Sequence, residues 1–228
     1  FQIDYLGRYT QKGMEKSKDT NTELTAEQVE AVDTKEVLED PKRFKMIARH
    51  IIDTYPTKTK HGEFTAMFCV SSVEVLTQYY ELFKQVQAEK QAEDEAQGKI
   101  FKPLTIATIF SYAANEAVET LDGLLDEESA DIPTQINQSS RDKLDSYIAD
   151  YNATFGTNYN SGDSYYAYYR DIATRVRNKQ IDILMVVNMF LTGFDAKTLN
   201  TLYVDKNLKH HGLIQAFSRT NRVKKKKK

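Results

Sequence analysis

The sequence predicts an α/β fold: a three-layer domain with a parallel sheet and flanking helices, preceded by a helical connector. Short, continuous apolar segments alternate with segments whose apolar residues recur at helical spacing. Strands that are apolar along their whole length are typical of a parallel sheet buried on both faces. The composition agrees, because 40% hydrophobic and 28% charged residues is the balance of a globular domain.

Residues 1–60 carry one strand signal, at Phe1–Tyr5, and two helix signals. Thr25–Leu38 opens with the pattern of a capping box, which predicts a helix start. Asp40–Pro41 opens the second helix, because proline is favoured at the first helical position. We expect that helix to end near Tyr55–Pro56. One of its faces is apolar, with Phe44, Ile47, Ala48, Ile51 and Ile52.

The alternation of strands and helices begins near residue 62. Ser71 and Ser72 are capping residues at the start of a helix whose far end, Glu89–Lys99, is charged and expected to be solvated. Later helices are expected at Arg141–Tyr151 and Ser164–Asn178. The predicted strands are Phe64–Val70, Leu104–Phe110, Ile181–Val187 and Thr201–Asp205. Function in such sheets collects at the carboxyl ends of the strands.

Other features limit the class of protein. The single cysteine, Cys69, cannot form an internal disulfide, which suits a reducing cytoplasm, and a small buried hydrophobe is its simplest interpretation. No apolar segment approaches the length of a bilayer span, so we expect no membrane contact. The chain opens at Phe1 without an initiator Met or a secretory signal, so we expect a piece of a longer protein.

The overall charge does not indicate a nucleic-acid-binding protein. Removing the lysines Lys224–Lys228, a native basic tail or a non-native addition, takes the formal net charge from −2 to −7. Residues 113–131 contain acidic side chains and no basic one; such segments are usually solvated, although contact with a partner subunit is an alternative. Any nucleic-acid contact must therefore come from local groups.

Two segments near the end of the chain carry the chemical information. Gly193 and Asp195 follow a predicted strand, where glycine lets the backbone pass close to a ligand. Arg219 and Arg222 are three residues apart, so they project from one face of a helix, and Gln215 extends that stripe. Two guanidinium groups and an amide on one face suit a phosphate chain. The alternatives are a plain turn and ordinary solvated arginines.

Together these segments resemble motifs V and VI of superfamily 2 helicases. The stretches Leu-Thr-Gly-Phe-Asp-Ala at 191–196 and Leu-Ile-Gln-Ala-Phe-Ser-Arg-Thr-Asn-Arg at 213–222 are similar to the motor (R) subunit of type I restriction enzymes. Tyr151–Asn158 and Tyr165–Arg170 look like the same family. The resemblance covers about Phe64 to Val223. It implies that residues 61–223 form the second RecA-like lobe of a helicase, that residues 1–60 connect it to a preceding lobe, and that 224–228 are a tail.

The resemblance implies roles for the motif VI residues. Arg222 matches the arginine finger that reaches the γ-phosphate of ATP held on the partner lobe. Arg219 matches the second motif VI arginine at the phosphates. Gln215 matches the glutamine that opens the motif and holds nucleotide or interlobe contacts. Such a finger stabilises the charge that spreads over phosphoryl oxygens in the transition state.

The resemblance also implies roles at two other strand ends. Gly193 and Asp195 match the motif V pair near the nucleotide sugar and the interlobe hinge. Ser71 and Ser72 fall where motif IV meets the DNA backbone. Thr192 departs from the arginine that many superfamily 2 helicases have before the motif V glycine, which leaves its own role open.

Two parts of an ATPase are missing from the sequence. It has no Gly-x-x-x-x-Gly-Lys-Ser/Thr phosphate loop and no Asp-Glu box for Mg²⁺. ATP with Mg²⁺ is therefore expected to be bound mainly by a preceding lobe, and the fragment alone is expected to be inactive. The resemblance implies double-stranded DNA, that lobe, and methyltransferase and specificity subunits as partners, in a cytoplasmic restriction endonuclease that translocates DNA.

Several other residues have more than one interpretation. Tyr165, Tyr166, Tyr168 and Tyr169 could stack on bases. All of them except Tyr166 share one helical face with Ile172 and Val176, which favours packing in the core. The four histidines do not assemble into a metal site, so none is expected. Asp205, at the end of a strand, either orients a motif VI arginine or is simply solvated.

Two alternatives to the restriction motor stay open. The first is a lobe of another superfamily 2 motor, such as a remodeller or a repair helicase. The second is a degenerate, non-catalytic lobe that serves as a docking module.

Overall fold

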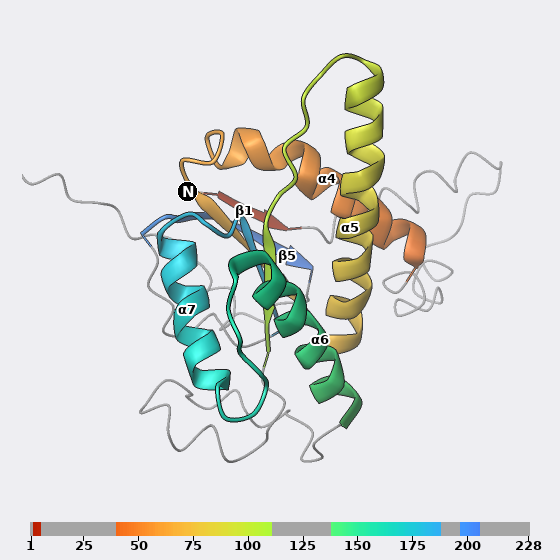
Figure 1. The fold of residues 1–228 in the computed structure, drawn as a ribbon. Coiled ribbons are helices and arrows are strands. Elements are labelled where there is room, and N and C mark those ends of the chain that lie inside the picture. Colours follow the sequence, from red (N-terminus) through yellow and green to blue (C-terminus); the bar gives the residue numbers. More distant parts are fainter. Residues whose placement is uncertain (1, 6–39, 111–137, 188–196, 206–228) are drawn as a thin grey trace, which may run out of the picture.

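The computed structural model describes residues 2–5, 40–110, 138–187 and 197–205 of the chain (Figure 1). The described part contains five strands and four helices. The strands are β1 (Gln2–Tyr5), β2 (Thr65–Val70), β3 (Ile106–Ile109), β4 (Ile183–Val187) and β5 (Leu199–Asp205). The helices are α4 (Pro41–Lys58), α5 (Val73–Ala96), α6 (Gln138–Phe155) and α7 (Tyr165–Arg177).

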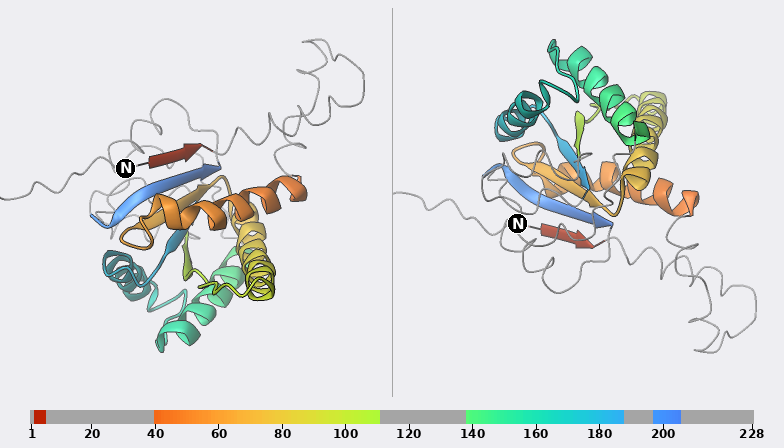
Figure 2. Two further views of the ribbon diagram at one scale, coloured as in Figure 1. Left: turned by 90° about the horizontal axis from the view of Figure 1, so that it is seen from above. Right: turned by 90° about the horizontal axis from the view of Figure 1, so that it is seen from below.

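The strands form one sheet in the order β1-β5-β2-β4-β3, and every pairing is parallel. α4 and α5 lie on one side of this sheet, α7 lies on the other, and α6 lies beside the β3 edge (Figure 2). The predicted α/β class with a parallel sheet flanked by helices is confirmed. All residues of β2 and β4 are buried, as their unbroken apolar sequences predict.

α4 begins as the sequence predicts and ends slightly later. The Asp40 side chain accepts a hydrogen bond from the backbone N–H of Lys42 at 2.8 Å, and Pro41 occupies the first turn. Pro56 lies inside the helix, which continues to Lys58 because a proline in the last turn removes only one backbone hydrogen bond. The buried face of α4 contacts α5 and β5.

The first sixty residues thus contribute two described elements to the same sheet domain, since α4 packs on it and β1 pairs with β5. The expected helix at 25–38 lies outside the described residues. The division of the chain into a connector and a lobe at residue 60 stays a prediction.

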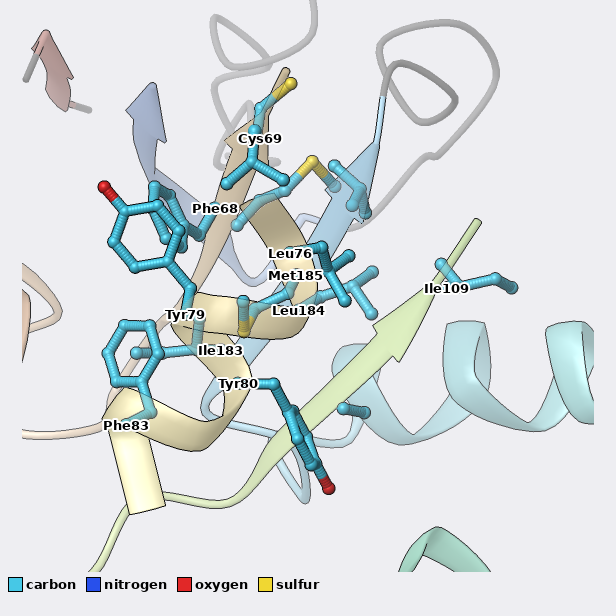
Figure 3. Packing of buried hydrophobic residues seen from close by; sticks show 14 of the residues in the cluster. Phe68, Cys69, Leu76, Tyr79, Tyr80, Phe83, Ile109, Ile183, Leu184 and Met185 are labelled. Atoms are coloured by element: carbon cyan, nitrogen blue, oxygen red, sulfur yellow. The ribbon is translucent and has the colours of Figure 1, made fainter. Parts of the chain in front are cut away.

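Aromatic residues fill the space between α4, α5 and the sheet. The ring of Phe68 in β2 lies 4.8 Å from that of Tyr79 and 6.0 Å from that of Phe83, between ring centroids (Figure 3). Phe44 of α4 contacts Tyr79 at 4.9 Å. Cys69, the next residue along β2, is fully buried and reduced, which confirms its interpretation as a small core residue.

The tyrosines of α7 cover the open edge of the sheet. Among the described strands β3 pairs only with β4, so alternate carbonyl groups of β3 point outward. Tyr168 donates its hydroxyl hydrogen to the carbonyl of Thr108 at 2.7 Å, and Tyr165 donates to that of Phe110 at 2.9 Å. Tyr168 is fully buried and Tyr165 is half-buried against the core, so the predicted packing role is confirmed.

Candidate functional site at the carboxyl edge of the sheet

Three neighbouring strands of the sheet end in a single row. Val70, the last residue of β2, is aligned with Val187 of β4 on one side and with Asp205 of β5 on the other. These three residues are also the last residues of their strands. The segments that follow them along the chain therefore leave the sheet from adjacent points on one edge.

Those segments contain the predicted site residues. Ser71 and Ser72 follow β2 directly. Gly193 and Asp195 follow β4, and their positions lie outside the described residues. The same holds for the motif VI residues that follow β5, which are Gln215, Arg219 and Arg222. The roles of these five residues stay predictions.

Helix starts meet the same edge. Ser72 is the N-cap of α5, and its side-chain oxygen accepts a hydrogen bond from the backbone N–H of Val75 at 3.3 Å. The first turn of α4 reaches the end of β5, because Arg43 contacts Asp205 there. Helix N-termini carry partial positive charge, so two such ends beside the row favour an anionic ligand such as phosphate.

The two serines differ in their surroundings. Ser72 is half-buried and its oxygen is engaged in the cap, whereas Ser71 is exposed. A hydroxyl can donate a hydrogen bond while its oxygen accepts one, so capping and a contact with a DNA phosphate are compatible at Ser72. The predicted DNA contacts at both serines stay predictions.

A buried ionic network lies under this edge. Arg43 of α4 donates from Nη1 to Oδ2 of Asp205 at 3.0 Å and from Nη2 to Oδ1, which makes a bidentate pair. Tyr79 of α5 donates its hydroxyl hydrogen to Oδ2 of the same carboxylate. Arg43 and Asp205 are 6% and 8% exposed and Tyr79 is fully buried, so the network is shielded from water.

The network keeps Tyr79 protonated and Arg43 charged. Burial raises the pKa of the Tyr79 hydroxyl well above its ordinary value, and the charge of Asp205 raises it further, so Tyr79 remains a donor. Burial alone would lower the pKa of Arg43, but the hydrogen bond and the charge of Asp205 outweigh that effect and raise it. Arg43 therefore stays charged at any working pH.

Sequence reasoning did not find Arg43 or Tyr79 in this role. Simple solvation of Asp205 is wrong, because the carboxylate is buried and bound by two side chains. A signal was present: Arg43 stands four residues before Ile47, on the apolar face of its helix. A charged residue on such a face requires a buried partner of opposite charge.

The outer face of α4 carries a shallow depression of about 510 Å³, lined by Lys42, Lys45, Met46, Arg49, His50 and Asp53. Two of its cations are already matched by acidic residues of α5: Lys45 lies 2.7 Å from Glu89, and Arg49 lies 3.0 Å from Glu93. The charged end of α5 is thus paired with α4 as well as solvated. The residues that line the depression all lie between positions 42 and 53, whereas the predicted site residues begin at Ser71.

No cluster of metal-ligating side chains occurs within the described ranges. No helix among the described residues is long and apolar enough to cross a bilayer.

The parallel sheet and its flanking helices are those of an α/β domain of the RecA-like class. The family described as type I restriction enzyme subunit R domain 3 matches residues 62–228. The chain is 41% identical over 232 aligned residues to a type I restriction enzyme endonuclease subunit of Staphylococcus aureus (strain COL), covering 100% of this chain and 22% of that protein.

Two further relatives agree. A type I restriction enzyme endonuclease subunit of Staphylococcus saprophyticus is 42% identical over 231 residues, which is 100% of this chain and 22% of that protein. A putative type I restriction enzyme endonuclease subunit of Methanocaldococcus jannaschii is 27% identical over 200 residues, covering 83% of this chain and 14% of that protein. The chain belongs to the type I restriction enzyme R subunit family, and it spans about a fifth of the length of the staphylococcal relatives.

Proposed function

We propose that this chain is the second RecA-like lobe of an ATP-dependent DNA translocase within a type I restriction endonuclease. The observation that carries the proposal is the row of strand ends at Val70, Val187 and Asp205. Motifs IV, V and VI each follow one of these three residues, so one edge of the sheet serves as the origin of all of them. The family of endonuclease subunits supplies the enzymatic context.

ATP with Mg²⁺ is held mainly by the preceding lobe in this proposal, and supplies the phosphoryl group that is transferred to water. Arg222 and Arg219 approach that group when the lobes close and neutralise the charge that develops on its oxygens. Gln215, Gly193 and Asp195 hold the nucleotide and the interlobe contact. The helix starts beside Ser72 and Arg43 fit this role, because they add positive potential at the same edge.

DNA is gripped through its backbone. Ser71 and Ser72 contact phosphates at the start of α5, and such contacts are independent of base sequence. Repeated closing and opening of the lobes while both hold DNA moves the double helix stepwise. Methyltransferase and specificity subunits of the same complex are the proposed partners, and the proposed compartment is the cytoplasm, which suits a buried, reduced Cys69.

The decisive experiment replaces Arg222 by Lys in the full-length endonuclease subunit that carries this domain. Lysine keeps the charge but loses the guanidinium fork, so DNA-stimulated ATP hydrolysis should fall by about a thousandfold, while nucleotide binding is retained. Steady-state kinetics and nucleotide-binding titration measure the two properties.

Arg170→Lys is the matched control, because Arg170 is an exposed arginine on α7, where its guanidinium lies over the ring of Tyr166. It should leave hydrolysis unchanged. If the Arg222→Lys variant hydrolyses ATP at the parent rate, the proposed motor function is wrong and the alternative of a non-catalytic docking lobe replaces it.

A further inference from the structure

The Arg43–Asp205–Tyr79 network joins three elements through one carboxylate. Asp205 is the last residue of β5, Arg43 lies in the first turn of α4, and Tyr79 lies in the second turn of α5. Both carboxylate oxygens are used, one by Nη2 of Arg43 and the other by Nη1 of Arg43 together with the Tyr79 hydroxyl. The orientation of the Asp205 side chain is therefore fixed relative to both helices.

Stability alone does not account for a network of this kind. Taking two charges out of water is costly, and replacing a buried ion pair by apolar residues of similar volume is often neutral or stabilising. Phe44 and Phe68 already surround Tyr79 with aromatic rings, so an apolar replacement would meet an apolar environment. Apolar residues would not fix the orientation of the residue at position 205, because dispersion forces, unlike hydrogen bonds, do not depend on a donor–acceptor axis.

The location of the network indicates what the fixed orientation of Asp205 contributes. Asp205 stands in the row of strand ends with Val70 and Val187, and the chain continues from it toward Gln215, ten residues further on. A small rotation of the backbone at Asp205 changes the direction in which the following segment leaves the sheet. A bidentate ion pair at that residue holds the rotation in one position.

We propose that Arg43, Asp205 and Tyr79 form a positioning network that sets the exit of the chain from β5 and thereby the approach of Arg219 and Arg222 to the nucleotide. This inference rests on the proposed function. None of the three residues contacts the nucleotide in it: they act through the segment that follows Asp205. A misplacement of about 1 Å at a reacting group can reduce a rate by about a hundredfold, so precise positioning has a measurable effect.

The first test is the double variant Arg43→Met/Asp205→Leu in the full-length subunit. It removes both charges together, so neither is left buried and unpaired. The thermal midpoint of the subunit should fall by no more than a few degrees, because the group left buried without its acceptor is the neutral Tyr79 hydroxyl and not a charge. The kcat for DNA-stimulated ATP hydrolysis should fall by about tenfold or more while the KM for ATP changes by less than about twofold, because the lost contact matters in the transition state.

The second test removes a single donor and keeps the packing. Tyr79→Phe retains the ring that contacts Phe44, Phe68 and Phe83 but loses the hydrogen bond to Asp205. Tyr80→Phe is the matched control. The Tyr80 hydroxyl points away from that of Tyr79 (Figure 3) and donates to Asp150 of α6 at 2.9 Å.

We expect Tyr79→Phe to lower kcat with little change in KM, and Tyr80→Phe to leave both constants at the parent values. If the double variant does not fold, this pair of variants decides. The inference is overturned if kcat is unchanged in the folded double variant, if Tyr79→Phe and Tyr80→Phe behave alike, or if only KM changes. These results are distinct from a failure of the proposed function, which would appear as full activity of Arg222→Lys.

Discussion

Buried polar groups show how single residues hold this domain together. Arg43 and Asp205 are 162 positions apart in sequence and form a bidentate ion pair in the interior, with Tyr79 as a third member. Tyr151 and Tyr168 pack edge to face, with ring centroids 5.0 Å apart, while their hydroxyl groups go separately to Asp171 and to the carbonyl of Thr108. Each of these two rings thus combines apolar burial with a hydrogen bond donated by its hydroxyl group.

Replacing Tyr168 by Phe tests the hydrogen bond to β3. The ring stays in the core, but the carbonyl of Thr108 loses its donor at the edge of the sheet. The free energy of unfolding of the 228-residue chain should fall by about 1 to 2 kcal/mol, measured by chemical denaturation. Tyr166→Phe, at the 57% exposed tyrosine two residues before it, should leave the stability unchanged. Equal effects of the two substitutions would contradict the edge-covering role of Tyr168.

Helix starts are where sequence and structure agree best at the scale of elements. Asp40 and Ser72 are both caps in the structure, as the sequence predicts, because capping depends on residues within one turn. Helix α6 is longer than predicted, running from Gln138 to Phe155, since packing of Tyr151 and Phe155 extends it beyond its apolar periodicity. Strand order could not be predicted, because pairing partners such as β1 and β5 are remote in sequence.

Substitutions at Ser71 and Ser72 can distinguish a helix-capping role from a role in DNA binding. Ser72→Ala should lower the free energy of unfolding by about 1 kcal/mol because α5 loses its N-cap, whereas Ser71→Ala should change it by less than about 0.5 kcal/mol. Ser72→Asn and Ser72→Asp both keep the cap. In the full-length subunit, Ser72→Asp should bind DNA more weakly than Ser72→Asn, since a carboxylate repels phosphate.

Denaturation curves and DNA titrations at fixed salt measure the two effects. Equal DNA affinities of Ser72→Asn and Ser72→Asp would remove Ser72 from the DNA contact and leave it as a cap alone.

The apolar segments of the sequence were sufficient to predict the strands of the sheet, but the candidate site could be predicted only in part. Four predicted strands lie where β2, β3, β4 and β5 are found, because burial on both faces leaves an unbroken apolar signature. The row formed by Val70, Val187 and Asp205 was expected only as a common edge, since its alignment depends on register. The motif V and VI residues stay predictions from resemblance.

The single cysteine offers a probe of the whole fold. Cys69 is fully buried in β2, which has a strand on each side, so a thiol reagent should reach it only when the sheet opens. Labelling should be slow in native buffer and should accelerate with denaturant in step with the loss of circular dichroism. A Cys69→Ala/Ala167→Cys variant, with its thiol at an exposed position of α7, should react at once. Fast native labelling of Cys69 would contradict its burial.

The place of β5 in the sheet has a consequence for synthesis on the ribosome. β5 is the last described strand along the chain, yet it lies between β1 and β2 and is the only described partner of β1. Of the described strands β1 is synthesised first, and it has no described partner until β5 has left the exit tunnel. Arg43 likewise gains its buried partner Asp205 only after β5 has been synthesised. β2, β3 and β4 can pair before β5 is synthesised, whereas β1 joins the described sheet only through β5, so this sheet is completed at a late stage.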